Sequence, residues 1–232
     1  MIDFLPFGPN DPMWLDNPVL TKFFWPALLE TLAMVSVATV TTVILGTPLG
    51  LLLASSSSSG IKPRTTLHQV LGFIVNMVRS FPFVILMITI IPLTRFLVGN
   101  TLGWYAACVP LTIGAIPFFA RLVESNVAAV EPGKIEAAQM MGASNLRIEW
   151  GVQVREALPR LVQSVTLLSV TLVGYSAMAG VLGAGGLGAL AINYGYQGWQ
   201  MDVLILTVVF FLIFVQVIQM CGDMISRLVD HR

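Results

Sequence analysis

The sequence predicts an all-α integral membrane protein with five transmembrane helices. Hydrophobic residues make up 56% of its 232 positions and charged residues only 10%, and the mean hydropathy is +0.84. Because soluble domains carry about 25% charged residues, this chain has too few to cover a surface that faces water. The net charge of zero indicates no nucleic-acid partner, and the two cysteines and two histidines offer no metal-ligand spacing.

Five apolar runs are long enough to cross a membrane, which takes roughly 20 residues of helix. They cover residues 24–54, 67–98, 102–123, 161–181 and 203–222. The second run is ambiguous, since as one helix it would be roughly 48 Å long, whereas the hydrocarbon core is about 30 Å thick. It must therefore tilt, break, or begin along the membrane surface.

The expected break in the second run is the string Arg-Ser-Phe-Pro at residues 79–82. Pro82 cannot donate a helical hydrogen bond and disfavours helix at Phe81. An arginine in the middle of the membrane costs about 2.5–3.5 kcal/mol on insertion scales. Arg79 therefore either lines a polar pore near Asn76 or anchors at the interface with its charge among the headgroups, and the sequence leaves both open.

Loop charges predict which end of each span faces the cytoplasm. Lys62 and Arg64 lie in the first loop and four further cations in the loop 124–160, whereas the opposite side carries Lys22 and Arg95. The positive-inside rule then puts the N-terminus outside and the C-terminus in the cytoplasm. The expected organisation is an external segment 1–23, a transmembrane domain 24–222 with a cytoplasmic loop at 124–160, and a cytoplasmic tail 223–232.

The first half of the loop 124–160 predicts a short helix with defined ends. Pro132 suits its first turn, and Gly142 suits the left-handed position that follows its last turn. Ile135, Ala138 and Met141 recur every three residues and form one apolar stripe.

The second half of the loop predicts another short helix, so that two helices lie across the cytoplasmic face of the membrane. Ser144 can cap this helix. Its apolar residues recur every four positions: Leu146, Trp150, Val154 and Leu158. Small side chains at Ala137, Ala138 and Ala143 allow another protein to approach closely. The alternative is an amphipathic hairpin on the membrane surface without a partner.

The string E-A-A at residues 136–138, followed by Gly142, resembles the coupling loop of bacterial ABC importer permeases. Over nearly its whole length the chain is similar to the permease subunits of methionine ABC importers. The resemblance is carried by residues 30–34, 79–83, 136–142 and 174–196, of which Gly-Tyr-Ser-Ala-Met at 174–178 and Tyr-Gly-Tyr at 194–196 are most typical of the methionine branch. The chain departs from the family pattern at Val154 and Arg155, where the family usually has Leu-Pro before Glu-Ala-Leu-Pro.

The resemblance implies a type I ABC importer permease fold in the bacterial inner membrane, surrounded by lipid. It implies that two copies of this chain pair with a cytoplasmic ATPase dimer that holds ATP and Mg, while a periplasmic or lipid-anchored binding protein delivers methionine. This chain would then bind no cofactor and hydrolyse nothing itself. The residues expected to couple it to the ATPase are Glu136, Ala137, Ala138, Met141, Gly142 and Ala143.

The fourth span is the predicted substrate path. Tyr175 and Ser176 supply hydroxyl groups, and Met178 supplies an adaptable thioether. Asn76 and Arg79 are the candidates from the second span. The small residues around them suit a plain helix–helix seam equally, which is the alternative interpretation.

Two segments outside the spans are rich in small residues. The five serines at 55–59 predict a flexible loop. The glycines after Val181 predict an external re-entrant turn, because glycine permits backbone angles that other residues avoid. That run lacks the lysine and the strand–helix context of a phosphate-binding loop, so it predicts no nucleotide site.

Several other functions fit less well. Another small amino acid or a betaine-like solute could use the same machinery. A stand-alone secondary transporter would need an internal repeat and a coupling-ion site, and five spans do not divide into two halves. A membrane enzyme needs a nucleophile and a base, but His68 stands at a membrane edge without a G-x-S-x-G string nearby.

Overall fold

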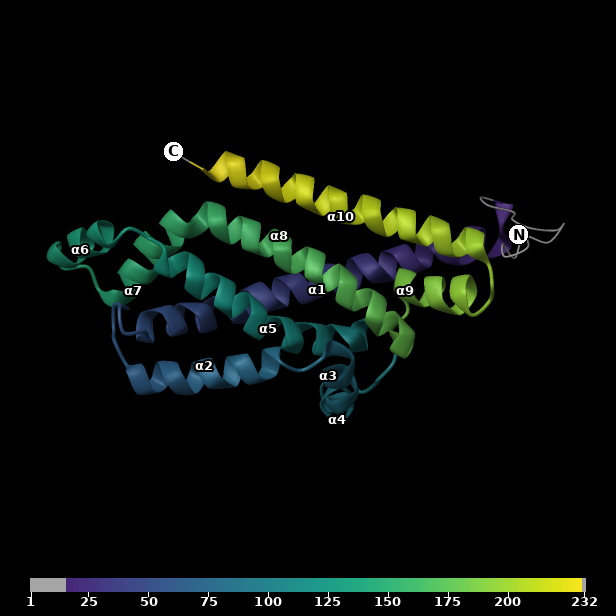
Figure 1. Ribbon diagram of the computed structural model, residues 1–232, viewed down its shortest axis with the longest axis horizontal. Helices are drawn as coiled ribbons and strands as arrows, with labels where there is room; N and C mark the ends of the chain where they lie inside the picture. Colours follow the sequence, from purple (N-terminus) through teal and green to yellow (C-terminus); the bar gives the residue numbers. More distant parts are fainter. Residues whose placement is uncertain (1–15, 231–232) are drawn as a thin grey trace, which may run out of the picture. The chain divides into compact units, whose positions relative to one another are not determined.

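The computed structural model describes residues 16–230, and within that range the regular structure is entirely helical (Figure 1). The predicted all-α fold is confirmed. The helices are α1 Pro18–Ser56, α2 Thr65–Arg79, α3 Phe83–Thr89, α4 Ile91–Val98, α5 Trp104–Ala128, α6 Pro132–Met140, α7 Asn145–Ile148, α8 Val154–Ala179, α9 Gly186–Leu190 and α10 Met201–Val229. Three π-helical turns occupy Glu149–Gln153, Gly180–Ala184 and Ala191–Tyr196.

Four described helical stretches are long and apolar enough to cross a membrane, and α2 with α3 makes a fifth if the broken pair is one span. The four are Pro18–Ser56, Trp104–Ala128, Asn145–Ala184 and Met201–Val229. Each overlaps one predicted span and extends beyond it. The first part of the predicted external segment, residues 1–15, and the end of the predicted tail, residues 231–232, lie outside the described residues.

The second predicted span breaks where the sequence indicated, because α2 ends at Arg79 and α3 begins at Phe83. A further break follows at Ile90, between α3 and α4. Pro92 lies in the first turn of α4, where a missing N–H leaves no helical hydrogen bond unmade. The run 67–98 therefore forms three helices.

The chain divides into two compact units. Unit 1 comprises the described part of Met1–Ala38, with Val84–Leu111 and Thr171–Val217. Its core joins the first part of α1 to α9 and the start of α10 through a cluster of buried residues that includes Leu20, Phe24, Leu187, Leu190 and Val203. The Asn17 side chain donates a hydrogen bond of 2.8 Å to Asp202 Oδ2, which fixes the first turn of α10.

Unit 2 comprises Thr39–Phe83, Thr112–Val170 and the described part of Ile218–Arg232. Within it α2 runs alongside the second part of α1 and α5 (Figure 1), and Leu53, Val75 and Ala120 form the buried contact between these helices. A Cβ at Gly50 of α1 would lie 2.5 Å from the Cβ of Val123. The small residue therefore lets α1 and α5 pack closely, as is common between membrane helices.

Candidate functional site

Helix α6 forms the first half of the predicted coupling loop, and both of its ends form as the sequence indicated. Pro132 lies in the first turn. Gly142 adopts a φ of +76° after the last turn, and its N–H donates to the Gln139 carbonyl at 2.9 Å. The N–H of Ala143 donates to the Ala138 carbonyl at 3.1 Å. These two bonds make a Schellman motif, which satisfies carbonyls at the end of the helix.

The end of α6 exposes two methionines outside the apolar spans. Met140 is 91% exposed and Met141 is 87% exposed. The prediction that Met141 shares a stripe with Ile135 and Ala138 is wrong. Those two residues are half-buried, whereas Met141 lies just after the last residue of α6 and is exposed. Large exposed apolar side chains in one place mark an interaction surface.

The six predicted coupling residues all lie on α6 or in the turn that follows it. Four of them are exposed and two are half-buried. The exposed ones are Glu136, Ala137, Met141 and Gly142, and the half-buried ones are Ala138 and Ala143.

One side of α6 borders a hollow of about 320 Å³, whose other walls come from the ends of α1 and α5 and from the π-helical turn before α8. Glu136 and Gln139 contribute to its lining. The serine run contributes as well, and it is not a simple flexible loop. Its first two residues complete α1, and Ser55 Oγ donates to Glu149 Oε1 at 2.8 Å. This hydrogen bond ties the end of α1 to the coupling loop.

The second helix of the loop is not a separate element, so that prediction is wrong. Helix α7 continues through a π-helical turn into α8, and the continuous stretch Asn145–Ala184 is long and apolar enough to cross a membrane. A π-turn adds a residue, because its bonds run from i to i+5, and it shifts the expected four-residue repeat. Gln153 is buried in consequence, whereas Leu146 and Trp150 are 70% and 47% exposed. Lys134 and Glu156 form an ion pair of 2.5 Å between α6 and the start of α8.

The sequence did not indicate an arginine network that lies beside the loop 124–160. The Nη2 atom of Arg121 in α5 donates to the Gly72 carbonyl and to Asn76 Oδ1, both on α2, at 3.0 and 3.1 Å. Its Nη1 atom donates to Glu124 Oε2 at 2.7 Å, and Glu124 lies 3.8 Å from His68 Nδ1. The local signal is the acid three residues after Arg121, but Asn76 is 45 positions away and nothing local indicates it.

The other predicted path residues fall in both units. In unit 2, Arg79 is the last residue of α2 and its side chain is exposed. In unit 1, Tyr175 is half-buried and Met178 is 47% exposed. Ser176 is buried and donates to the Val173 carbonyl at 2.8 Å, within its own helix. These three path candidates lie within about one turn of α8, with Ser176 buried and Met178 exposed.

In unit 1 the glycine run turns the chain, as predicted, and two side chains of α1 hold the turn. Gly186 has a φ of +74°, and its N–H donates to Glu30 Oε2 at 2.7 Å. The N–H of Leu187 donates to Thr31 Oγ1 at 2.9 Å. A Cβ at Gly186 would lie 2.7 Å from Thr31 Oγ1 and 2.8 Å from Met34 Cε. We call this arrangement the Glu30–Thr31 clamp.

The described residues provide exposed contact surfaces, and hydrogen bonds and an ion pair that connect one helix to another. Among residues 16–230, no group of three or more histidine, cysteine, aspartate or glutamate side chains is placed to hold a metal ion. The chemistry of the loop and the clamp is that of hydrogen bonding, ion pairing and apolar contact.

Comparison with known proteins identifies one family. Residues 46–232 match the family described as binding-protein-dependent transport system inner membrane component. The probable D-methionine transport system permease protein MetI of Vibrio cholerae is 48% identical over 218 residues, which are 94% of this chain and 95% of that protein. The methionine import system permease protein MetP of Bacillus subtilis is 41% identical over 219 residues, 94% of this chain and 98% of that protein.

A solved structure gives the same result for the fold. A chain in an inward-facing conformation of the MetNI methionine ABC transporter matches with a TM-score of 0.90 at 42% identity. The match covers 91% of this chain and 98% of that chain.

Proposed function

Because this chain belongs to the family of binding-protein-dependent transport system inner membrane components, we propose that it forms the translocation path of an ATP-driven methionine importer. It is an inner-membrane permease with the type I fold. Relatives that are 48% and 41% identical are named for methionine transport. Their names support methionine over another small amino acid or a betaine-like solute.

The observation that carries the proposal is the exposed end of α6. Met140 and Met141 stand almost fully exposed beside a glycine turn, outside the apolar spans. Apolar anchors that a partner can desolvate supply much of the binding energy of protein interfaces, and methionine adapts its shape to a partner. We assign this surface to the ATPase. ATP and Mg belong to that partner, while this chain binds no cofactor and hydrolyses nothing.

The proposed assembly contains two copies of this chain and two ATPase subunits. The N-terminus is outside, and α6 and the tail face the cytoplasm. A periplasmic or lipid-anchored binding protein delivers methionine to the external mouth. Similarity to a chain of the solved methionine transporter supports the permease–ATPase part of this assembly.

Coupling starts when ATP binding closes the ATPase dimer and displaces α6. Two contacts can carry the displacement into the spans of unit 2. The Lys134–Glu156 ion pair connects α6 to α8, and the Ser55–Glu149 hydrogen bond connects the loop to α1. The proposed path residues are Tyr175, Ser176 and Met178 in unit 1 and Asn76 and Arg79 in unit 2.

The test is uptake of radiolabelled methionine by cells with and without this chain, with ATP depletion as the control. We expect uptake that requires the chain and stops when ATP is depleted. Uptake driven by an ion gradient after ATP depletion would contradict the proposal. If cells without the chain lost the uptake of a betaine-like solute but still took up methionine normally, the assignment of methionine as the substrate would be wrong.

A further inference from the structure

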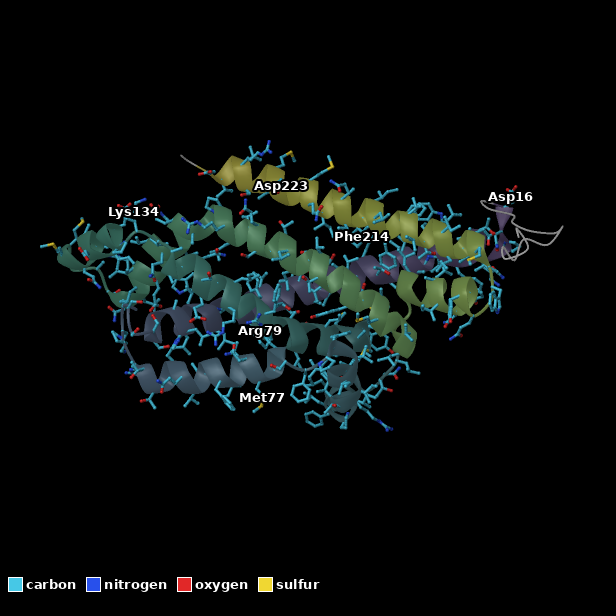
Figure 2. All side chains as sticks on the ribbon, in the orientation of Figure 1. Asp16, Met77, Arg79, Lys134, Phe214 and Asp223 are labelled. Carbon is cyan, nitrogen blue, oxygen red and sulfur yellow. The ribbon has the colours of Figure 1, made fainter. Side chains whose placement is uncertain are left out.

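Unit 2 contains a second hollow, of about 340 Å³, between the start of α6, the start of α8 and the end of α10. Figure 2 labels Lys134, which lies in the α6 part of its wall. The lining is mostly charged and polar, and includes Lys134, Arg155, Glu156, Arg160, Ser226 and Asp230. It is separate from the hollow beside Glu136.

The charges that line this hollow leave cationic donors available. Three cations and two carboxylates line it, which leaves a net charge of +1. Lys134 pairs with Glu156 at 2.5 Å. Arg160 uses Nη1 to donate to the Ala129 carbonyl at 3.3 Å, and a guanidinium has five N–H donors in total. The side chain of Arg155 is exposed and makes no ion pair or hydrogen bond with the part of the chain that the structure describes.

The length of α10 places the hollow at the level of the lipid headgroups. The helix has 29 residues, and a helix of that length extends about 43 Å. A bilayer measures about 40–45 Å when its headgroup layers are included. If α10 runs from one bilayer surface to the other, Ser226 and Asp230 at its end bring the hollow that they line to the headgroup layer.

We propose that this hollow binds the phosphate of an anionic phospholipid, with Arg155 and Arg160 as the donors. A guanidinium matches a phosphate with two parallel N–H bonds, and basic pockets between membrane helices at the cytoplasmic side bind anionic headgroups. The cytoplasmic placement rests on the proposed orientation, whereas the binding itself does not depend on what the pore carries.

The test is native mass spectrometry of the full chain, purified from membranes with the ATPase that accompanies it. The complex is titrated with phosphatidylglycerol and, separately, with phosphatidylcholine. We expect one saturable phosphatidylglycerol site per chain and weaker binding of phosphatidylcholine. Arg155→Gln should weaken phosphatidylglycerol binding about tenfold, because the charged hydrogen bonds from the guanidinium to the phosphate are lost.

Arg64→Gln is the matched control, because Arg64 is an exposed arginine at the start of α2 that does not line the hollow. It should leave lipid affinity within about twofold. Arg155→Lys keeps the charge but loses the planar guanidinium and its parallel N–H donors. Its affinity for phosphatidylglycerol should lie between those of the parent and Arg155→Gln. A melting temperature that rises with phosphatidylglycerol in the parent and much less in Arg155→Gln would support the site independently.

Three results would overturn the proposal. The first is equal affinity for the two lipids. The second is displacement of phosphatidylglycerol by millimolar inorganic phosphate, which would assign the hollow to a soluble anion. The third is loss of the copurifying ATPase in Arg155→Gln with lipid affinity unchanged, which would assign Arg155 to a protein interface.

Discussion

Two chain reversals, one in each unit, are built around left-handed glycines, and their surroundings differ completely. At Gly186 a Cβ would meet Thr31 and Met34 within 3 Å, and the Glu30–Thr31 clamp binds the N–H groups of Gly186 and Leu187. At Gly142, no heavy atom of the described residues lies within 4 Å of where a Cβ would stand. The same backbone conformation therefore occurs in a turn that side chains of this chain hold in place and in a turn with open surroundings, which we assign to a partner. Changes at the first should affect stability, and changes at the second should affect transport.

The largest expected effect is that of Gly186→Ala. An L-residue in the left-handed region costs roughly 1–2 kcal/mol and overpacking roughly 1–3 kcal/mol, so the free energy of unfolding should fall by roughly 2–5 kcal/mol. Unfolding of the purified chain and its amount in the membrane measure this. Gly174→Ala is the control, because no described heavy atom lies within 4 Å of its Cβ position. Equal stability of the two variants would show that the clamped turn tolerates a side chain.

Thr31→Val should have the next largest effect. It removes the acceptor of the buried N–H of Leu187 while keeping the side-chain shape, and an unsatisfied buried donor costs about 1–3 kcal/mol. Thr47→Val is the control, since among the described residues the Thr47 hydroxyl bonds only the Val43 carbonyl of its own helix. It should change stability by less than about 0.5 kcal/mol. Denaturant titration of both variants decides whether the clamp stabilises the fold.

The double substitution Met140→Glu with Met141→Glu tests the open turn. Methionine uptake should fall about tenfold, corresponding to about 1.4 kcal/mol of lost partner contact, while unfolding stays within about 0.5 kcal/mol of the parent. The double substitution to leucine keeps the apolar surface and should retain most uptake. If the glutamate variant transported normally, the partner surface would have to lie elsewhere.

The smallest expected effect is that of Gly142→Ala, measured by the same uptake assay. A left-handed L-residue costs roughly 1 kcal/mol, which corresponds to about a fivefold change in an equilibrium. The open surroundings add no steric cost. Gly142→Asn should transport better than Gly142→Ala, because asparagine tolerates the left-handed region. The opposite order would mean that the backbone angle at this position is not what transport requires.

Features set by local chemistry could be predicted from the sequence. Pro82 marks the break between α2 and α3, Pro132 the start of α6, and Gly142 its left-handed end. In each case one residue type excludes or permits a backbone conformation. The residue and its near neighbours in the sequence are therefore enough to predict the feature. The apolar runs are equally local, which is why the spans could be placed.

Features that join distant segments could not be predicted. Glu30 meets Gly186 across 156 positions, and Arg121 meets Asn76 across 45. Their partners depend on which helices pack together, and apolar periodicity does not specify that. The π-turn before α8 was missed for another reason. It moves Gln153 inward, and the register of a regular helix gives no sign of the added residue.

The most direct test of the open turn is the number of methionine molecules imported per ATP hydrolysed. It would be measured in vesicles that contain the transporter with either the parent chain or the Met140→Glu, Met141→Glu chain. We predict that ATP hydrolysis continues with the variant while import per ATP falls about tenfold, since the proposed contact surface is lost. An unchanged ratio at a normal import rate would contradict the assignment of α6 as the element that couples this permease to its ATPase.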